Sequence, residues 1–358
     1  MQTVRRRRRF DIANYIPQIV GLIAVILIVV FICSLFTKDI KKVKKSKMDL
    51  MPFKAENVFT AFAGGAVYIK DGQVLYVDDR NEIMWGFEGA DNEMQLFAGT
   101  SKVAVTKGKK IQVINKEGTL VFTKEFNKNI SSVAVGEKLI AVSLSNSDDT
   151  IILNGTGEEI DRIISNVNNT NIRFGVFEDN SVWVITVENT GLNPKYQLST
   201  YKYDSGKTQT VAFSDDSQMM YDAVFNNNIC YIFGTEKIMV RDCDYTGTVN
   251  KDYKANGYDV IACGSAEKSV NLLLLNNGRI KAINQKGIFN LECEEKVLFG
   301  AVNQKHFYAF SNYYMYKYKA KNGKVTKYRF PVRIDNIVQG TDYIIVQSGN
   351  DMYRYSLA

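Results

Sequence analysis

Side chains that could perform catalysis or bind a metal are few and scattered along this chain. His306 is the only histidine, so a Ser-His-Asp or Cys-His mechanism would have to use it. It opens an alternating strand next to Phe307 and Tyr308, and we expect it to face solvent or a neighbouring sheet. A single histidine also excludes zinc and iron sites that are built from several histidines.

The cysteines form no C-x-x-C pair, so their spacing indicates neither a metal site nor a thioredoxin-like redox site. Cys33 lies in an apolar run near the N-terminus. Cys230 and Cys243 flank one hairpin, where one register would place them opposite each other. Cys263 and Cys293 belong to the first and last strands of one repeat and are not expected to be neighbours. Two disulfides among the last four are an alternative, but small buried thiols are the preferred interpretation.

Carboxylates occur in turn-like contexts rather than in a recognisable site. Residues 242–247 read DCDYTG, which matches part of a calcium loop but lacks the distal Glu. Adjacent acid pairs occur at Asp78–Asp79, Asp148–Asp149 and Asp215–Asp216. Aspartate favours turns, and the sequence does not place two of these pairs at the separation that a carboxylate hydrolase needs. We therefore predict no catalytic residue, no metal site and no cofactor, and hence a protein that is not an enzyme.

The elements that would have to position any site are strands. A hairpin recurs about eight times between Val58 and the C-terminus: an alternating strand, a polar turn that usually contains glycine, and another alternating strand. Examples read IQVINKEGTLVF from Ile111 and IKAINQKGIFN from Ile280. Glycine supplies the positive φ that such tight turns need. Repeats of this length made only of strands are typical of a β-propeller.

Counting the strands predicts an all-β fold with eight four-stranded blades. Seven blades are the alternative if the weakly patterned fourth repeat is misparsed. The last repeat, residues 334–357, contains only three strands, while a strand-like segment at 50–55 belongs to no repeat. We expect segment 50–55 to complete the last blade, which joins the ends of the ring and leaves no open sheet edge there. The predicted propeller therefore covers residues 50–358.

A second feature is an uncharged apolar run of 21 residues at 16–36. As a helix this run would be ~31 Å long, against ~30 Å for the hydrocarbon core of a bilayer. A cleaved signal peptide is the alternative, but residues 33–36 offer no small-x-small cleavage site. We predict a transmembrane helix that remains attached as a signal anchor. A basic tail (1–15) precedes it, and a Lys-rich stalk (37–49) follows it.

Charge is concentrated around this run. Residues 1–50 contain eleven basic and three acidic residues, whereas the rest of the chain contains 34 basic and 35 acidic residues. The nearly neutral body is unsuited to nucleic acid, whose binding depends on neutralising phosphates. The block Arg5–Arg9 favours an N-terminus inside the cell, because five clustered charges on a short tail are costly to translocate. We expect a single-pass protein of the cell membrane with its propeller outside, and a cytoplasm-facing propeller is the alternative.

The fourth repeat is irregular, because ENTGLNPKY forms the longest insertion in any repeat, between Val187 and Gln197. Loops that depart from a repeat often carry function on a rigid scaffold. Tolerated surface growth is the other interpretation. The candidate interaction residues are Glu188, Asn189, Leu192, Asn193, Lys195 and Tyr196.

Hairpins such as INKEGTLVF and YKAKNGKVTKY resemble quinoprotein and YVTN-type propeller repeats across Val58 to Leu357. The resemblance implies the architecture only. Quinoprotein repeats usually end in Trp, and here only Trp85 fits, with Phe122 and Val211 in the corresponding places. The layout of Arg block, span, Lys stalk and propeller resembles a bacterial family of single-pass membrane proteins, which implies no activity.

Together these observations favour a membrane-anchored, extracytoplasmic binding or scaffold module. Its expected partners are the membrane bilayer and a protein or a cell-envelope polymer. A propeller enzyme is the alternative, either a quinoprotein-like oxidoreductase or a carboxylate hydrolase. A cytoplasm-facing assembly platform is the third interpretation.

Overall fold

The computed structural model describes residues 23, 25–28, 40–91, 93–166, 168–177, 180–189, 193–203, 208–226, 228–243, 249–266 and 269–357. It divides the chain into two units, Met1–Lys41 and Lys42–Ala358. In the first unit, Ile23 and residues 25–28 are helical with exposed side chains. The predicted tail (1–15) and most of the predicted span (16–36) lie outside the described residues. None of the helices among the described residues has the length and apolar character needed to span a bilayer.

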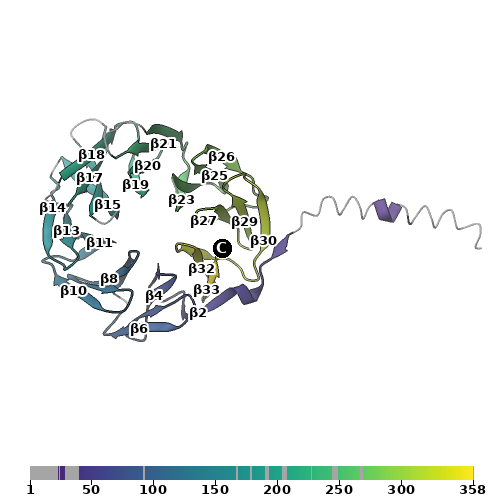
Figure 1. The fold of residues 1–358 in the computed structure, drawn as a ribbon, viewed down its shortest axis with the longest axis horizontal. Coiled ribbons are helices and arrows are strands. Elements are labelled where there is room, and N and C mark those ends of the chain that lie inside the picture. The colour runs from purple at the N-terminus through teal and green to yellow at the C-terminus, as the bar shows by residue number, and fades with distance from the viewer. Residues whose placement is uncertain are drawn as a thin grey trace, which may run out of the picture. The chain divides into compact units, whose positions relative to one another are not determined.

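The second unit is a ring of eight antiparallel sheets, or blades, so the count of eight is confirmed (Figure 1). Blade 1 contains β3 (Phe59–Phe62), β4 (Gly65–Lys70), β5 (Gln73–Val77) and β6 (Ile83–Glu88). Blade 2 contains β7 (Gln95–Ala98), β8 (Lys102–Lys107), β9 (Lys110–Asn115) and β10 (Leu120–Glu125). Blade 3 contains β11 (Ile130–Val135), β12 (Leu139–Leu144), β13 (Thr150–Asn154) and β14 (Glu159–Ile163). Blade 4 contains β15 (Asn169–Phe177), β16 (Ser181–Glu188), β17 (Lys195–Lys202) and β18 (Thr208–Asp215).

The second half of the ring repeats the same order of strands. Blade 5 contains β19 (Met220–Asn226), β20 (Ile229–Gly234), β21 (Lys237–Asp242) and β22 (Asn250–Lys254). Blade 6 contains β23 (Asp259–Ala266), β24 (Ser269–Asn276), β25 (Arg279–Asn284) and β26 (Gly287–Leu291). Blade 7 contains β27 (Phe299–Val302), β28 (His306–Phe310), β29 (Tyr314–Lys319) and β30 (Val325–Arg329). Blade 8 contains β31 (Asn336–Gln339), β32 (Tyr343–Ser348), β33 (Asp351–Ser356) and β2 (Met48–Lys54).

Blade 8 is assembled from both ends of the propeller. Its sheet order is β2-β33-β32-β31, and Met48 pairs with Tyr355 while Lys54 pairs with Asp351. β2 therefore occupies the fourth-strand place that the last repeat lacks. Its side chain Phe53 is fully buried and stacks on Tyr68 of blade 1 at 4.7 Å between ring centroids.

The segment predicted as a stalk, 37–49, is largely part of the folded unit. Within it, β1 (Lys41–Lys42) lies beside β30, and a 3-10 helix, η2 (Lys45–Lys47), leads into β2. Val43 donates its backbone N–H to Arg329 O at 2.9 Å, and its side chain is buried with Met48 between blades 7 and 8. The reason is that Val43 and Met48 are apolar residues spaced among the lysines, and their burial holds the segment against the propeller. The propeller thus begins before residue 50.

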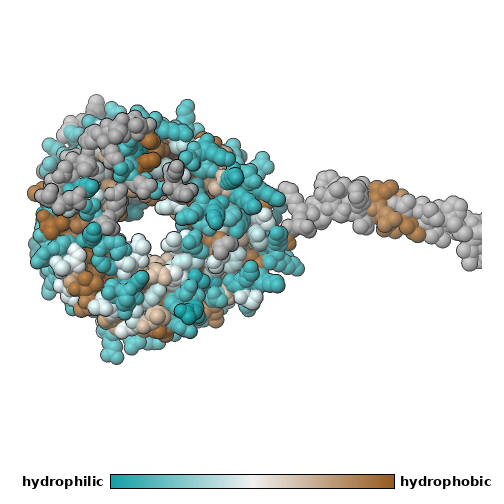
Figure 2. All heavy atoms as spheres, viewed as in Figure 1, coloured by the Kyte–Doolittle hydropathy of each residue, from teal (hydrophilic) through white to brown (hydrophobic). Residues whose placement is uncertain are grey.

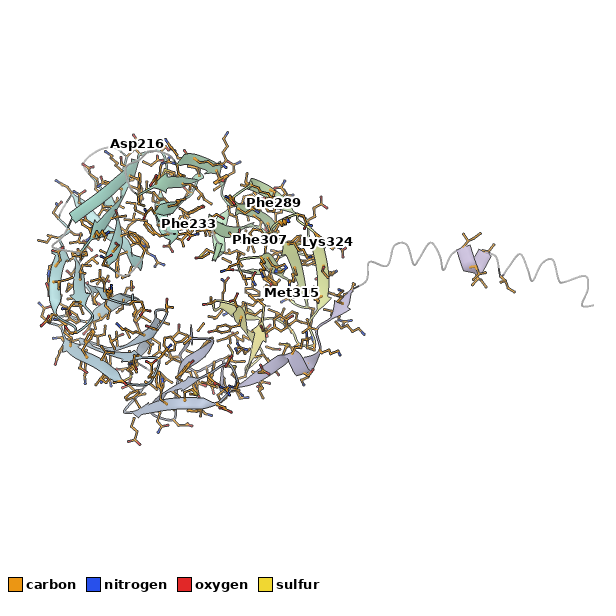
Figure 3. The ribbon with its side chains drawn as sticks, viewed as in Figure 1. Asp216, Phe233, Phe289, Phe307, Met315 and Lys324 are labelled. Carbon is orange, nitrogen blue, oxygen red and sulfur yellow. The ribbon has the colours of Figure 1, made fainter. Side chains whose placement is uncertain are left out.

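The core lies between neighbouring blades, where alternate side chains of adjacent sheets interdigitate. One such layer joins Ile111 and Val113 of blade 2 to Ile140 and Val142 of blade 3. In Figure 3, Phe233 and Phe307 lie among the sheets nearer the centre of the ring, whereas Asp216 and Lys324 lie at its periphery. Figure 2 shows an opening at the middle of the ring on the face seen there.

Two turn glycines explain why the repeat needs glycine after its third strand. Gly118 has φ +86°, and a Cβ atom there would lie 2.7 Å from the ring of Trp85 in the preceding blade. Gly157 repeats this contact with Phe122, which a Cβ atom would approach to 2.5 Å. Trp85 also donates its indole N–H to Lys116 O at 3.0 Å. An aromatic residue on the fourth strand of one blade therefore packs beneath the turn between the third and fourth strands of the next blade. In blade 2, Phe122 takes the place of the expected Trp.

Antiparallel pairing gives the ring two different faces. Turns between first and second strands and turns between third and fourth strands lie on one face, called face A; in blade 7 these are residues 303–305 and 320–324. Turns between second and third strands and the connections between blades lie on the other face, called face B; in blade 7 the turn is residues 311–313. A bond from the Ala320 N–H to Lys305 O, at 2.9 Å, joins the two turns of face A.

Candidate binding site

Blade 4 has the longest strands of the ring, with nine residues in β15 and eight in each of β16, β17 and β18. The corresponding strands of blade 3 have six, six, five and five residues. At about 3.3 Å per residue, each extra pair of residues lengthens a strand by about 7 Å. Blade 4 is therefore the taller sheet, and it offers surface that its neighbour does not cover.

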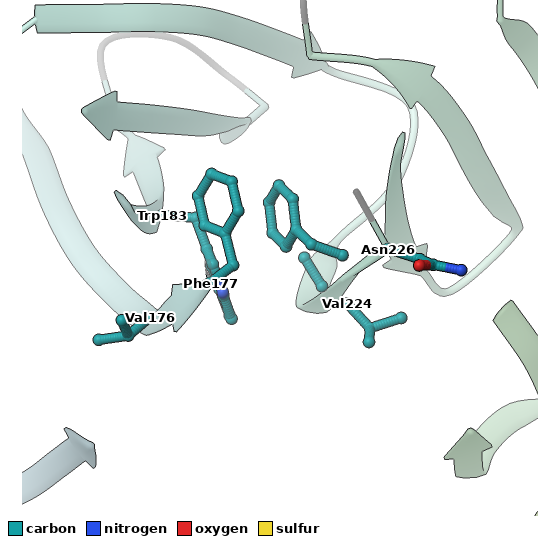
Figure 4. A pocket seen from close by; sticks show the side chains of 7 residues that line it. Val176, Phe177, Trp183, Val224 and Asn226 are labelled. Atoms are coloured by element: carbon teal, nitrogen blue, oxygen red, sulfur yellow. The ribbon is translucent and has the colours of Figure 1, made fainter. Parts of the chain in front are cut away.

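An apolar cavity of about 290 Å³ lies between blades 4 and 5, at the C-terminal ends of β15 and β19. Figure 4 shows Phe177 and Trp183 on one side of it and Val224 and Asn226 on the other. Phe177 stacks on Phe225 at 3.9 Å between ring centroids. These rings fill the interface between two blades, so we interpret this cavity as a packing feature.

A polar cavity of about 340 Å³ lies on face B between blades 3 and 4. Its lining is dominated by hydroxyl and amide groups from the turn after β12 and from the start of β15. The hydroxyl-bearing residues are Ser131, Ser132, Ser143, Ser145, Ser147 and Thr150. Asn146, Asn171 and Arg173 add further polar groups. This arrangement can donate and accept several hydrogen bonds to one bound group.

Local bonds hold the two walls of this polar cavity in place. Asn171 donates its backbone N–H to the Ser165 hydroxyl oxygen at 2.9 Å and its side-chain amide to Ile163 O at 3.0 Å. The hydroxyls of Ser131 and Ser143 lie 2.6 Å apart on neighbouring strands. Arg173 reaches away to Asp222 of blade 5, with 3.1 Å between Nη2 and Oδ2. The cavity is thus a formed feature of the fold.

Thr150 is the most informative residue of this lining. Thr150 is only 1% exposed, yet its hydroxyl has no hydrogen-bond partner among the described residues. A buried hydroxyl without a partner costs about 1–3 kcal/mol.

Replacing Thr150 by Val is therefore expected to raise the free energy of unfolding by about 1 kcal/mol, because the shape is kept and the unpaired hydroxyl is removed. Urea unfolding of the purified chain measures the change. Ser311→Ala is the matched control: the Ser311 hydroxyl is buried but donates to Glu295 at 2.7 Å, so its loss should destabilise the fold. A Thr150→Val variant that is less stable than the wild type would show that the hydroxyl is bonded in the folded protein.

The irregular hairpin of blade 4 rises beside this polar cavity. Its two strands, β16 and β17, remain paired into the segment that the sequence marks as an insertion, with Glu188 opposite Lys195 and Val187 opposite Tyr196. Of the six candidate residues, Glu188, Lys195 and Tyr196 are therefore strand residues. Asn189 and Asn193 lie in the exposed turn, and Leu192 lies outside the described residues. Asn171 of the cavity pairs with Thr186 of the same hairpin, so the structure brings hairpin and cavity together.

The serines of the polar cavity were not singled out from the sequence. The signal that could have found them is SLSNSDDT at residues 143–150, a hydroxyl-rich turn where the first and sixth repeats have the short turns KDG and NNG. That the cavity also needs the start of β15, more than 20 residues later, is a tertiary fact.

His306 begins β28 as predicted, half-buried on the side of blade 7. Its ring centroid lies 5.8 Å from that of Tyr308. Burial, and then the charges of Lys317, Lys319 and Lys305, together lower the pKa of His306 to about 4. We found no metal-binding group of three or more His, Cys, Asp or Glu residues within the described part of the chain.

This lowered pKa predicts acid sensitivity. Because the folded state disfavours protonated His306, stability is complete above the unfolded pKa of about 6.5 and is lost as pH falls towards 4. His306→Gln, which cannot titrate, should therefore lose less melting temperature than the wild type between pH 7 and pH 4.5. Thermal unfolding monitored by circular dichroism at both pH values tests this, and equal losses in the two proteins would contradict it.

The described cysteines are free thiols, so no disulfide joins them. Cys230 and Cys243 are buried together between blades 4 and 5. Burial raises the pKa of Cys230, and burial raises that of Cys293 to about 11. Thiols with raised pKa values are poor nucleophiles at neutral pH.

The three acid pairs lie in three different blades and stabilise turns. Asp78 accepts the backbone N–H groups of Arg80 and Glu82, each at 2.9 Å. Asp149 accepts the backbone N–H of Ser165 at 2.9 Å. Asp215 accepts that of Ser217 at 2.8 Å. The DCDYTG segment lies mostly outside the described residues.

No protein-family model matches this chain, and no curated protein matches it in sequence. Solved structures do match it in shape. BamB from Moraxella catarrhalis aligns with a TM-score of 0.57 at 11% identity, over 88% of this chain and 99% of that one. The computationally designed Ika8 protein aligns with a TM-score of 0.61 at 14% identity, over 86% and 99%. Apo AztD from Citrobacter koseri aligns with a TM-score of 0.54 at 11% identity, over 81% and 88%.

The fold is that of an eight-bladed β-propeller. At these identities the likeness extends to the fold alone. Within the propeller, blade 4 carries the features that depart from the repeat, namely its strand length, its insertion and the polar cavity at its border with blade 3.

Proposed function

We propose that this protein is a membrane-anchored, extracytoplasmic β-propeller that acts as a binding or scaffold module for a protein or a cell-envelope polymer. The observation that carries the binding role is the polar cavity on face B, lined by several hydroxyl-bearing residues, with the irregular hairpin beside it. A rigid ring that holds an exposed hairpin next to a polar cavity is suited to recognising a hydrogen-bonding partner.

The anchoring part of the proposal is supported by the sequence. The run at 16–36 is uncharged and long enough to cross a bilayer, and the Arg5–Arg9 block favours an N-terminus inside. In this arrangement residues 1–15 form a cytoplasmic tail, and the propeller lies outside the cell membrane.

Site-specific photo-crosslinking in cells tests the binding role. A photo-reactive residue in place of Asn193 should give a discrete adduct, which should weaken when Ser131→Ala and Ser143→Ala remove two hydroxyls from the cavity. The control position is Lys109, an exposed residue in the corresponding turn of blade 2. Equal labelling at both positions would contradict a site at blade 4.

Orientation is tested separately by a reporter fused after the C-terminus. A reporter that functions only in oxidising extracytoplasmic surroundings should be active. Activity confined to a cytoplasmic reporter would assign the propeller to the inner side of the membrane and would leave the crosslinking result to be judged independently.

A further inference from the structure

We infer that face A of blade 7, together with Lys47 before β2, is a docking surface for the anionic headgroups of a lipid bilayer. This basic surface comprises Lys47, Lys286, Lys305, Lys319, Lys321 and Lys324. It is separate from the polar cavity, which lies on face B. The inference rests on the proposed membrane anchor for its choice of polyanion.

The charge pattern of blade 7 differs from that of the rest of the propeller. From Lys296 to Ile334 the chain contains nine lysines and arginines and no aspartate or glutamate. The whole body after residue 50 is nearly balanced, with 34 basic and 35 acidic residues. Blade 7 therefore carries a net positive charge, which acidic residues elsewhere in the ring offset.

Turn geometry brings these lysines to one face. Lys305 lies in the turn between β27 and β28. Lys319 ends β29, and Lys321 and Lys324 lie in the turn that follows it. The Ala320 N–H donates to Lys305 O at 2.9 Å, so the two turns touch. All four lysines are exposed. Lys324 lies at the periphery of the ring, on a side that is largely hydrophilic (Figures 2 and 3).

Neighbouring elements extend the surface on both sides. From blade 6, Lys286 donates its ammonium to Lys321 O at 2.6 Å. From the N-terminal segment, Lys47 immediately precedes Met48, which pairs with Tyr355 at the face A end of blade 8. Asn303 in the first turn of blade 7 donates to Leu357 O at 3.2 Å, which ties blade 8 to the same face.

Few acids offset this charge. The acidic residues on the described part of the basic surface are Asp49 and Asp342. Across the ring, face A of blade 3 presents three glutamates, Glu137, Glu158 and Glu159, against one lysine in its turns, Lys138. Face A is thus polarised, with its positive side at blades 6 to 8.

The surrounding titratable groups respond to this field. Burial lowers the pKa of Lys317, and the charges of Lys319 and Lys47 lower it further. The same cluster acts on His306, whose pKa is also lowered. Mutual repulsion of this kind is relieved when an anion from outside binds next to the lysines.

The short segment that follows the proposed span favours a bilayer as the source of the anionic groups. Only residues 37–40 separate the predicted span from Lys41 of β1, which lies beside β30 of blade 7. Five extended peptide steps reach at most about 18 Å. The proposed anchor would therefore keep the propeller close to a bilayer, and clusters of lysine near a membrane attract anionic headgroups within a Debye length of about 8–10 Å.

The test uses the full chain reconstituted in phosphatidylcholine vesicles with or without 30% phosphatidylglycerol. A fluorescent non-natural residue replaces Asn322, at the tip of the third turn of blade 7, and energy transfer to a headgroup-labelled lipid is measured. The matched probe replaces Thr156, in the corresponding turn of blade 3 across the ring (Figure 1). We expect at least twofold higher transfer from position 322 in the anionic vesicles, and no such gain from position 156.

Charge variants and salt identify the cause. K305Q/K319Q/K321Q/K324Q should abolish the gain, as should 0.5 M NaCl. K109Q/K110Q/K128Q/K254Q changes the net charge equally, but at exposed lysines of face B, and should keep it. Equal transfer in both lipids, or a gain that survives the first variant, would overturn the inference. Soluble polyphosphate provides the last control. If it abolishes the gain at a charge concentration far below that of the lipid, the surface binds a free polyanion and the inference is overturned as well.

Failure of the anchor is distinguishable from failure of the basic surface. Resistance to alkaline carbonate extraction reports the span and does not depend on lipid charge. If the chain is extracted, co-sedimentation of the full chain with anionic but not with zwitterionic vesicles still supports the basic surface, and its absence overturns it.

Discussion

Replacing Phe53 by Ala is expected to lower the free energy of unfolding by about 3–5 kcal/mol, the range found for large aromatic residues removed from a core. Phe53 is fully buried on β2 and packs between Tyr68, at 4.7 Å, and Phe59, at 5.1 Å between ring centroids. These two partners belong to blade 1, whereas β2 completes blade 8. The substitution therefore opens a void at the one junction where the two ends of the propeller meet.

Leu50→Ala is the control for this prediction. Leu50 lies on the same strand but is 51% exposed, so its loss should cost less than about 1 kcal/mol. Urea unfolding followed by tryptophan fluorescence measures both variants. If Phe53→Ala were no less stable than Leu50→Ala, β2 would not be the closing strand of the ring in solution.

Gly118→Ala is expected to destabilise the propeller by about 2–4 kcal/mol. Part of the loss comes from the positive φ of +86°, which costs about 1 kcal/mol for a residue with a Cβ atom. The remainder comes from overpacking, because the added Cβ would lie 2.7 Å from the ring of Trp85. The indole must then move, and its hydrogen bond to Lys116 O is lost with it.

Gly323 occupies the corresponding turn of blade 7 and separates the two causes. Its φ is +69°, but a Cβ atom there would meet nothing within 4 Å. Gly323→Ala should therefore show the conformational cost alone, about 1 kcal/mol. Equal melting temperatures for the two variants would show that docking of Trp85 under Gly118 contributes nothing to stability.

The hairpin repeat could be predicted from the sequence because each blade is built from residues that are close along the chain. Alternation such as Ile111, Val113 and the glycine turn at Gly118 requires only neighbouring residues, and short antiparallel hairpins are the structures that such patterns specify. The place of segment 50–55 followed from counting strands, since one strand was left over and one place was open. Where the N-terminal stalk ends could not be predicted. Val43 and Met48, which pack on the propeller, are isolated apolar residues within a run of lysines and form no recognisable pattern.

The candidate site shows the opposite case. The insertion in blade 4 was visible as an interruption of the repeat, and the structure places it next to a cavity that the sequence did not reveal. That cavity joins the turn after β12 to the start of β15, so its lining is set by how two blades pack rather than by any local pattern. The same reason hid the basic surface, because Lys286, Lys305 and Lys321 come from three turns that meet only on one face of the ring.

By itself, the sequence determined the class of fold and the concentration of charge and apolar residues near the N-terminus, and it favoured eight blades over seven. These follow from periodicity, turn chemistry and composition, which act between residues that are close along the chain. Only the tertiary structure decided which turns share a face, which polar residues line the cavity on face B and where the lysines gather. Those features arise because closing a ring brings distant segments together, and no pattern along one strand encodes which segment of another blade will lie beside it.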